Sequence, residues 1–133
     1  MAQTLGAYIT VDGVGAAIDF YKAAFAAEEV MRMPSDEHPG KFLHAELKLF
    51  GGTLMMSDDF GMEGFASPLK LGATTFNLIV GLDKPADVDA ALAKAEAAGA
   101  TVTMPAADQF WGDRFGMVRD PFGHAWGFGA PKG

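Results

Sequence analysis

Hydrophobic and polar residues alternate along this chain with two different periods, and the periods follow one another in a repeated order. Residues 7–11 alternate at period two, which predicts a short strand. Residues 15–26 carry apolar side chains at helical spacing, which predicts a helix with one buried stripe. Three further strands are predicted, over residues 28–33, 42–49 and 53–58. The first half therefore predicts one βαβββ unit.

The second half repeats this order. A strand is predicted over residues 75–80, and a helix then begins at the N-cap candidate Asp83 and ends before Gly99. The last three strands are predicted over residues 100–105, 114–119 and 125–129. A turn at Asp120-Pro121-Phe122-Gly123 joins the final two, because proline fixes φ and glycine tolerates positive φ. The chain is therefore predicted to be one unit written twice.

Each predicted strand has one side suited to a helix and one mixed or polar side. In the third strand, aliphatic residues at 43, 45, 47 and 49 are expected to meet the helix, while His44 and Glu46 stand on the other side. In the strand over 75–80, Asn77 takes that second side. These polar sides are expected to face whatever the sheets enclose.

The two halves are expected to form a single domain over residues 1–133, because no polar linker separates them. Module one covers about residues 5–59, the connection about 60–73, and module two about 74–130. The connection contains more apolar side chains than a linker would. We expect it to cover a cavity or a partner subunit.

Composition narrows the classes of partner. The net charge of −7 argues against nucleic acid and anionic membranes as partners. The chain has no cysteine, which excludes disulfides, zinc–thiolate sites and thiol catalysis. Neither a signal-peptide pattern nor an apolar run of membrane-spanning length occurs, so a cytoplasmic protein is expected.

Five segments together resemble one known group of proteins. They are Ile18-Asp-Phe-Tyr21, His44-Ala-Glu-Leu47, Gly52-Thr-Leu-Met-Met-Ser-Asp58, Val102-Thr-Met-Pro105 and Phe110-Trp-Gly-Asp-Arg-Phe-Gly-Met-Val-Arg-Asp-Pro-Phe-Gly123. With them the chain resembles the vicinal oxygen chelate superfamily, which includes glyoxalase I, extradiol dioxygenases and bleomycin-resistance proteins. The segments are most similar to its PhnB-like branch, and the resemblance covers nearly the whole chain.

The resemblance implies an α+β fold, in which two βαβββ modules form a curved, open, eight-stranded mixed sheet around a cavity. It places the helices on the outer face of the sheet and implies a homodimer. The alternation of each strand agrees with this fold independently of the resemblance.

Superfamily enzymes place His, Glu or Gln metal ligands at the start of the first strand and on the last strand of each module. The matching positions in this chain are Gly6, Met55 or Met56, Thr75 and Gly127. None supplies a strong oxygen or nitrogen ligand for a divalent metal. We therefore predict no metal site and no cofactor at these positions.

Four residues on the polar sides of the strands are candidates for a site. His44 and Glu46 could transfer a proton, with the carboxylate orienting the imidazole, or could bind a metal; a polar pair lining a wet groove or a dimer contact is the alternative. Tyr8 and Asn77 occupy corresponding places in the two first strands and could hydrogen-bond a ligand, although water often satisfies such groups.

Two more candidates lie around the last hairpin. Arg114 is expected on the cavity side near Trp111, where the pair could hold an anionic or planar ligand. An ion pair with Asp113 or an exposed charge is an equally good interpretation of Arg114, and Trp111 could belong to the core. His124 lies in a turn and is expected to be exposed.

These observations favour a protein that binds an unknown small molecule in the cavities of a homodimer, without the superfamily metal. Any catalysis would be proton transfer by His44 with Glu46. One alternative is a metal-dependent lyase, isomerase or dioxygenase with a relocated divalent metal on these two residues. A second alternative is a sequestering protein of the resistance type, which binds a compound without turnover.

Overall fold

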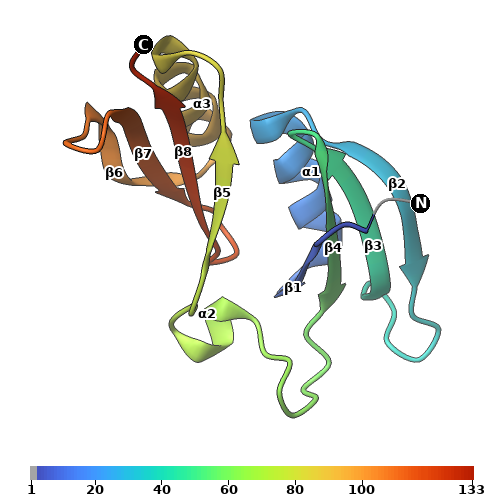
Figure 1. Cartoon of the computed structure of the whole chain (residues 1–133). Helices are drawn as coiled ribbons and strands as arrows, with labels where there is room; N and C mark the ends of the chain where they lie inside the picture. Colours follow the sequence, from blue (N-terminus) through green and yellow to red (C-terminus); the bar gives the residue numbers. More distant parts are fainter. Residues whose placement is uncertain (1–2) are drawn as a thin grey trace.

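A computed structural model of the chain describes residues 3–133, and it contains the predicted module twice. Module one consists of β1 (Ala7–Val11), α1 (Val14–Phe25), β2 (Glu28–Pro34), β3 (Phe42–Leu49) and β4 (Gly52–Asp58). Module two consists of β5 (Asn77–Gly81), α3 (Pro85–Ala98), β6 (Thr101–Asp108), β7 (Asp113–Arg119) and β8 (Ala125–Pro131). A short helix, α2 (Pro68–Leu71), lies in the connection (Figure 1).

The two modules have the same strand order, which confirms the predicted duplication. Sheet one has the order β1-β4-β3-β2, and sheet two has the matching order β5-β8-β7-β6. In each sheet the first strand pairs in parallel with the last, and all other pairs are antiparallel. The α+β class is confirmed, but the eight strands form two separate four-stranded sheets and not one continuous sheet.

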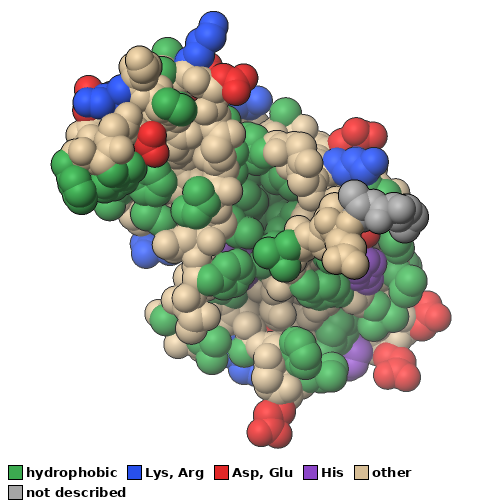
Figure 2. Space-filling view, viewed as in Figure 1, with side chains coloured by type: hydrophobic (Ala, Val, Ile, Leu, Met, Phe, Trp, Pro, Cys, Tyr) green, Lys and Arg blue, Asp and Glu red, His purple; other side chains and the backbone are tan. Residues whose placement is uncertain are grey.

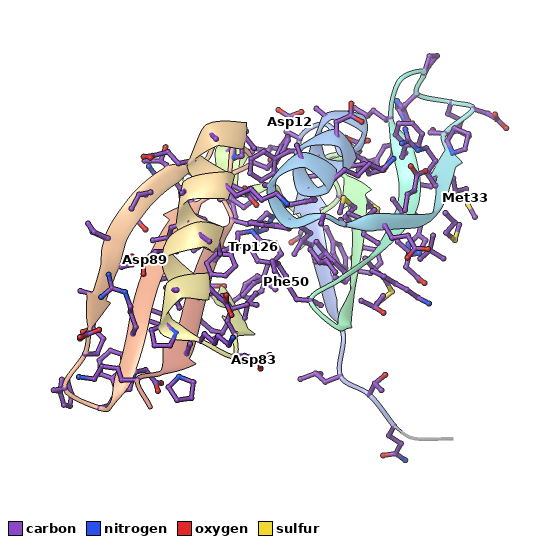
Figure 3. All side chains as sticks on the ribbon, turned by 90° about the horizontal axis from the view of Figure 1, so that it is seen from above. Asp12, Met33, Phe50, Asp83, Asp89 and Trp126 are labelled. Atoms are coloured by element: carbon purple, nitrogen blue, oxygen red, sulfur yellow. The ribbon has the colours of Figure 1, made fainter. Side chains whose placement is uncertain are left out.

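The helices lie between the two sheets, and one apolar core joins the modules (Figures 1 and 3). Helix α1 packs against α3 and also reaches sheet two, where the Phe25 ring lies 4.7 Å from Trp126 and 5.7 Å from Phe128. Full burial of such side chains contributes roughly 1.5–3 kcal/mol each. Within one chain the helices therefore pack between the two sheets, and each sheet turns its other face, the one without these helices, outward.

A buried carboxylate connects the strongest sequence motif of module two to helix α1. Asp120 Oδ2 accepts hydrogen bonds from the Tyr21 hydroxyl at 2.5 Å and from Trp126 Nε1 at 2.9 Å. Asp120 Oδ1 accepts from the backbone N–H groups of Phe122 and His124. We call Tyr21, Asp120 and Trp126 the buried hub. Because it uses both oxygens of the carboxylate, it fixes the turn and holds the two modules together.

His124 also contributes to the junction between modules, contrary to the exposed position expected for it. Its side chain is 4% exposed, and Nε2 lies 2.9 Å from the carbonyl oxygen of Thr10 in β1. The turn residue is buried because the end of hairpin β7–β8 packs against module one.

Asp58 has the corresponding structural role in module one. Its carboxylate accepts from the backbone N–H groups of Gly13 and Val14 at the start of α1, and from that of Phe42 at the start of β3. The helix N-terminus is stabilised by this nearby negative charge. The fourth strand thus fixes the position of the helix that covers it.

One predicted orientation in β3 is reversed. Phe42 packs against the core, while Leu43 is 48% exposed on the outward side. The pairing of β2 with β3 shifts register between Met33 and Pro34, and such a bulge changes the side to which the next residues point. Beyond it, Ala45 and Leu47 are buried as predicted.

We call the outward sides of the sheets open face one and open face two. Open face one carries, among others, Tyr8, Thr10, Met31, Met33, His44, Glu46, Met55 and Ser57. Open face two carries, among others, Asn77, Ile79, Met104, Phe115, Met117, Arg119, Ala125 and Gly127. Neither α1 nor α3 covers these faces, so many of their side chains are available for binding.

Candidate functional site

Tyr8 and His44 form a polar pair on open face one. The Tyr8 hydroxyl lies 2.9 Å from His44 Nδ1, and the two ring centroids are 5.4 Å apart. Tyr8 reaches His44 across β4, which lies between their strands in the sheet. The pairing leaves Nε2 of the imidazole without a hydrogen-bond partner among residues 3–133. A ring held on one side and free on the other can donate or accept a proton at the free nitrogen.

Glu46 does not orient His44, contrary to the prediction for this pair. The two side chains share open face one, but no hydrogen bond or ion pair joins them within the described part of the chain. Residues two apart on one strand are separated by almost 7 Å along it, whereas Tyr8 approaches from another strand. Tyr8 therefore has the orienting role predicted for the carboxylate.

The connection between modules covers one end of this pair. A pocket of about 310 Å³ is lined by Tyr8, Ser57, Asp58, Phe60, Met62 and Phe65. The aromatic and methionine side chains of the connection thus line a cavity, as its apolar composition predicted. Tyr8 is a wall residue of this mainly apolar pocket and also carries a polar hydroxyl, a combination typical of small-molecule sites.

Backbone hydrogen bonds give the covering segment a defined shape. The Asp59 carboxylate accepts from the backbone N–H groups of Gly61 and Ser67, and these bonds lower its pKa below the usual value. Lys41 Nζ donates to the Asp59 carbonyl oxygen at 2.7 Å. The segment that covers the pocket is therefore held at both ends by Asp59.

The candidates from module two lie on other parts of the surface. Asn77 is exposed at the start of β5, on open face two. Trp111 is 51% exposed in the turn between β6 and β7, where its ring lies 6.1 Å from Phe115. Within one chain neither residue belongs to the pocket beside His44. The structure therefore divides the predicted set between two outward faces.

Arg114 points to the opposite side from the one predicted. It donates two hydrogen bonds to the Asp89 carboxylate of α3, at 2.7 and 2.8 Å, and a third to Asp108 at 3.1 Å. Arg114 lowers the pKa of Asp89, and the two carboxylates raise the pKa of Arg114. The alternative of an Arg–Asp pair describes its state, although the partners differ from the expected Asp113.

Strand parity explains this error and identifies a residue that the sequence reasoning missed. Gly116 and Val118 face the helices, so Arg114 shares their side and Arg119 falls on open face two. The alternation of Phe115 and Met117 was visible in the sequence. Extended by two residues, it would have placed Arg119 on the outward face.

A wide groove lies between the modules, at the free edges of β1 and β5. It has a volume of about 510 Å³, and its apolar walls include Leu5, Phe50, Phe76, Ile79 and Trp126. Figure 2 shows hydrophobic side chains in this hollow, and Figure 3 shows Phe50 and Trp126 pointing into the space between the modules. Asn77 is the one predicted site residue that lines it, so the groove is an apolar surface with little catalytic chemistry.

The superfamily metal positions do not fit a metal. The Phe115 ring and Ile79 cover Gly127 so closely that an added Cβ would lie 2.7 and 2.8 Å from their atoms. Met56 is buried, and Met55, on the open face, offers a thioether beside Gly6. Within residues 3–133, no group of three or more His, Asp or Glu side chains is placed to hold a metal ion.

None of the helices in residues 3–133 combines the length and apolar character needed to cross a membrane.

Two βαβββ modules with matching strand order, packed through their helices, define the fold class of this protein. The family model of the Glyoxalase/Bleomycin resistance protein/Dioxygenase superfamily matches residues 3–128. The chain therefore belongs to this superfamily, which confirms the resemblance seen in its sequence motifs.

Three relatives show how far the similarity extends. An uncharacterized protein of Mycobacterium bovis is 46% identical over 132 residues, covering 96% of this chain and 82% of the relative. The solved structure of an Arabidopsis thaliana gene product is 31% identical, with a TM-score of 0.73 and coverage of 96% and 98% of the two chains. The structure of a Bacillus cereus PhnB protein is 23% identical, with a TM-score of 0.73 and coverage of 95% and 98%; it supports the fold alone.

Proposed function

We propose that this chain is a small-molecule-binding protein of the PhnB-like type that functions without the superfamily metal. The carrying observation is the Tyr8–His44 hydrogen bond beside the 310 Å³ pocket that the connection covers. Tyr8 lines this mainly apolar pocket and His44 lies beside it, so a ligand could be buried against the apolar wall and oriented by the polar pair. Any reaction would be proton transfer at the free nitrogen of His44, with Tyr8 holding the ring.

We also propose a homodimer in which open face one of each chain meets open face two of the other. Large apolar side chains are exposed on both faces, such as Met31 and Met33 on the first and Ile79 and Met104 on the second. Apolar patches of this kind on an otherwise soluble surface are typical of association sites. A two-fold pairing would cover both patches twice and close the pocket over His44.

Binding is tested by a thermal-shift screen of metabolites and drugs, followed by turnover assays on every compound that stabilises the protein. A true site ligand should lose at least about tenfold in affinity in Tyr8→Phe and His44→Ala. Lys94→Ala, an exposed change on α3, is the matched control. Ligands that bind all four proteins equally would contradict the proposed site, and turnover would separate an enzyme from a sequestering protein.

The dimer is tested by analytical ultracentrifugation of Met33→Lys and Ile79→Lys. Each introduces a charge on one proposed contact face, and each should shift the protein from dimer to monomer. A wild type that sediments as a monomer at high concentration would contradict the pairing.

A further inference from the structure

Arg119 differs from the other two arginines of this chain. Arg32 forms an ion pair with Glu29, and Arg114 forms ion pairs with Asp89 and Asp108. Among residues 3–133, Arg119 makes no ion pair or hydrogen bond with any side chain. Because a guanidinium is always charged, its five N–H donors are available to a ligand.

Arg119 lines a cavity of about 490 Å³ on open face two. The hydroxyl residues Thr74, Thr101 and Thr103 line the same cavity, while Pro68 and Gly123 form part of its wall. That wall is well defined, because a Cβ at Gly123 would lie 2.7 Å from Pro68. The α2 segment therefore packs tightly on the turn between β7 and β8.

The carboxylate nearest in sequence to Arg119 forms no ion pair with it among residues 3–133. Asp120 also borders the cavity, but its carboxylate oxygens accept four hydrogen bonds within the buried hub and the turn. No other acidic residue of the described chain lines this cavity. The cavity thus contains an arginine with no ion-pair partner among residues 3–133, in a protein whose net charge is −7.

On open face two, paired residues of neighbouring strands form rows across the sheet, and two adjacent rows beside this cavity differ in polarity. The first row is polar or small, and the strand register gives it as Thr101, Arg119, Ala125 and Asn77. The next row on the same face is apolar, consisting of Met104, Met117, Gly127 and Ile79. The Phe115 ring lies over Gly127 and extends the apolar surface further. Charge and apolar surface therefore lie at adjacent positions.

We propose that open face two binds an amphipathic oxyanion. Arg119 and the threonine hydroxyls hold the carboxylate, sulfonate or phosphate oxygens, and the apolar part of the ligand lies along Met117, Ile79 and Phe115. Arginine suits such groups because its planar donors match two oxygens at once. The small side chain of Ala125, which lines the cavity, leaves room for the ligand beside Arg119. The inference rests on the proposed small-molecule function and adds the ligand class.

The test uses two fluorescent probes with the same ring system. 1-Anilinonaphthalene-8-sulfonate carries the oxyanion, and N-phenyl-1-naphthylamine is the neutral compound without it. Binding of both is measured to the wild type, to Arg119→Gln and to Arg114→Gln, which removes an arginine charge on the other side of the same strand. We expect Arg119→Gln to weaken the sulfonate probe about tenfold and to leave the neutral probe unchanged.

Each other outcome has a distinct meaning. Equal weakening of both probes, or equal weakening by Arg114→Gln, would overturn the oxyanion site, because a general structural or charge effect would account for it. A wild type that binds the neutral probe but has no preference for the sulfonate would overturn this inference and leave the proposed function standing. A wild type that binds neither probe would count against both.

Discussion

The two tyrosines of this chain show how differently its inside and its outward faces are built. Tyr21 is fully buried and donates at 2.5 Å to Asp120, whose oxygens have four donors in all. Tyr8 is 48% exposed and meets a histidine whose other ring nitrogen has no hydrogen-bond partner among residues 3–133. A saturated network leaves nothing for a ligand, whereas an open pair has remaining hydrogen-bonding capacity. The family motifs contain residues of the buried hub and also His44 of the exposed pair, so a motif match alone does not identify a binding site.

This comparison predicts that the largest effect of all comes from breaking the buried hub at its acceptor. Asp120→Ala leaves the Tyr21 hydroxyl, Trp126 Nε1 and two backbone N–H groups without their partner. Loss of such a buried network should lower the free energy of unfolding by about 3–5 kcal/mol, measured by urea denaturation. Asp36→Ala, at an exposed loop position, is the control. A loss as small as that of the control would contradict the role of the hub.

Two glycines extend the comparison to the two sides of sheet two. A Cβ at Gly116, on the helix side, would lie 2.6 Å from Leu92 and 3.0 Å from the Ala106 backbone nitrogen. Gly116→Ala should therefore destabilise by about 1–3 kcal/mol. At Gly127 the close atoms are the ends of Phe115 and Ile79 on the open face, which can rotate outward. Gly127→Ala should cost less than Gly116→Ala in the same urea experiment, and the reverse order would show that open face two is rigid.

Tyr21→Phe removes one hydrogen bond of the hub without removing the ring. The expected loss at neutral pH is about 1–2 kcal/mol. Burial raises the pKa of Tyr21 well above its usual value, and Asp120 raises it further. Between the unfolded and the folded pKa, the folded chain keeps a proton that the unfolded chain releases, so stability should fall as pH rises above about 10.

The pH dependence provides the control for this variant. Wild type should lose up to about 1.4 kcal/mol per pH unit above pH 10 through Tyr21, and Tyr21→Phe should lack that contribution. Tyr8→Phe should retain it, because this change leaves Tyr21 and Asp120 in place. Parallel pH profiles for the wild type and Tyr21→Phe would contradict the assignment.

The periodic elements could be predicted from the sequence because alternation reports burial directly. Period two predicted the strands of both modules, the buried Ala45 and Leu47 and the outward His44. Helical spacing predicted the long helix of each module. The reversal of Phe42 and Leu43 could not be predicted, because a bulge changes strand parity without a fixed sequence signature.

The site was harder to predict than the fold, because its contacts join distant segments. Tyr8 and His44 are 36 residues apart, and their contact depends on β4 lying between β1 and β3. Proximity in sequence suggested Glu46 as the partner, whereas the sheet order selects Tyr8. His124 was expected in solvent for a similar reason: a turn is exposed only if no other module covers it, and here β1 does.

The smallest stability effect is expected on open face one. Tyr8→Phe should change the free energy of unfolding by no more than about 0.5 kcal/mol, because water replaces an exposed hydrogen bond.

The main effect of Tyr8→Phe should instead appear in the tautomer of the His44 ring. In the wild type the hydroxyl, 2.9 Å from Nδ1, holds the ring in one neutral tautomer; without the hydroxyl the two neutral tautomers should mix. Ring ¹⁵N chemical shifts measure this, with His38 as internal reference. An unchanged His44 tautomer would contradict the orienting role of Tyr8. A stability loss comparable to that of Tyr21→Phe would mean that the Tyr8 hydrogen bond is structural, like those of the buried hub, and would count against a ligand site on open face one.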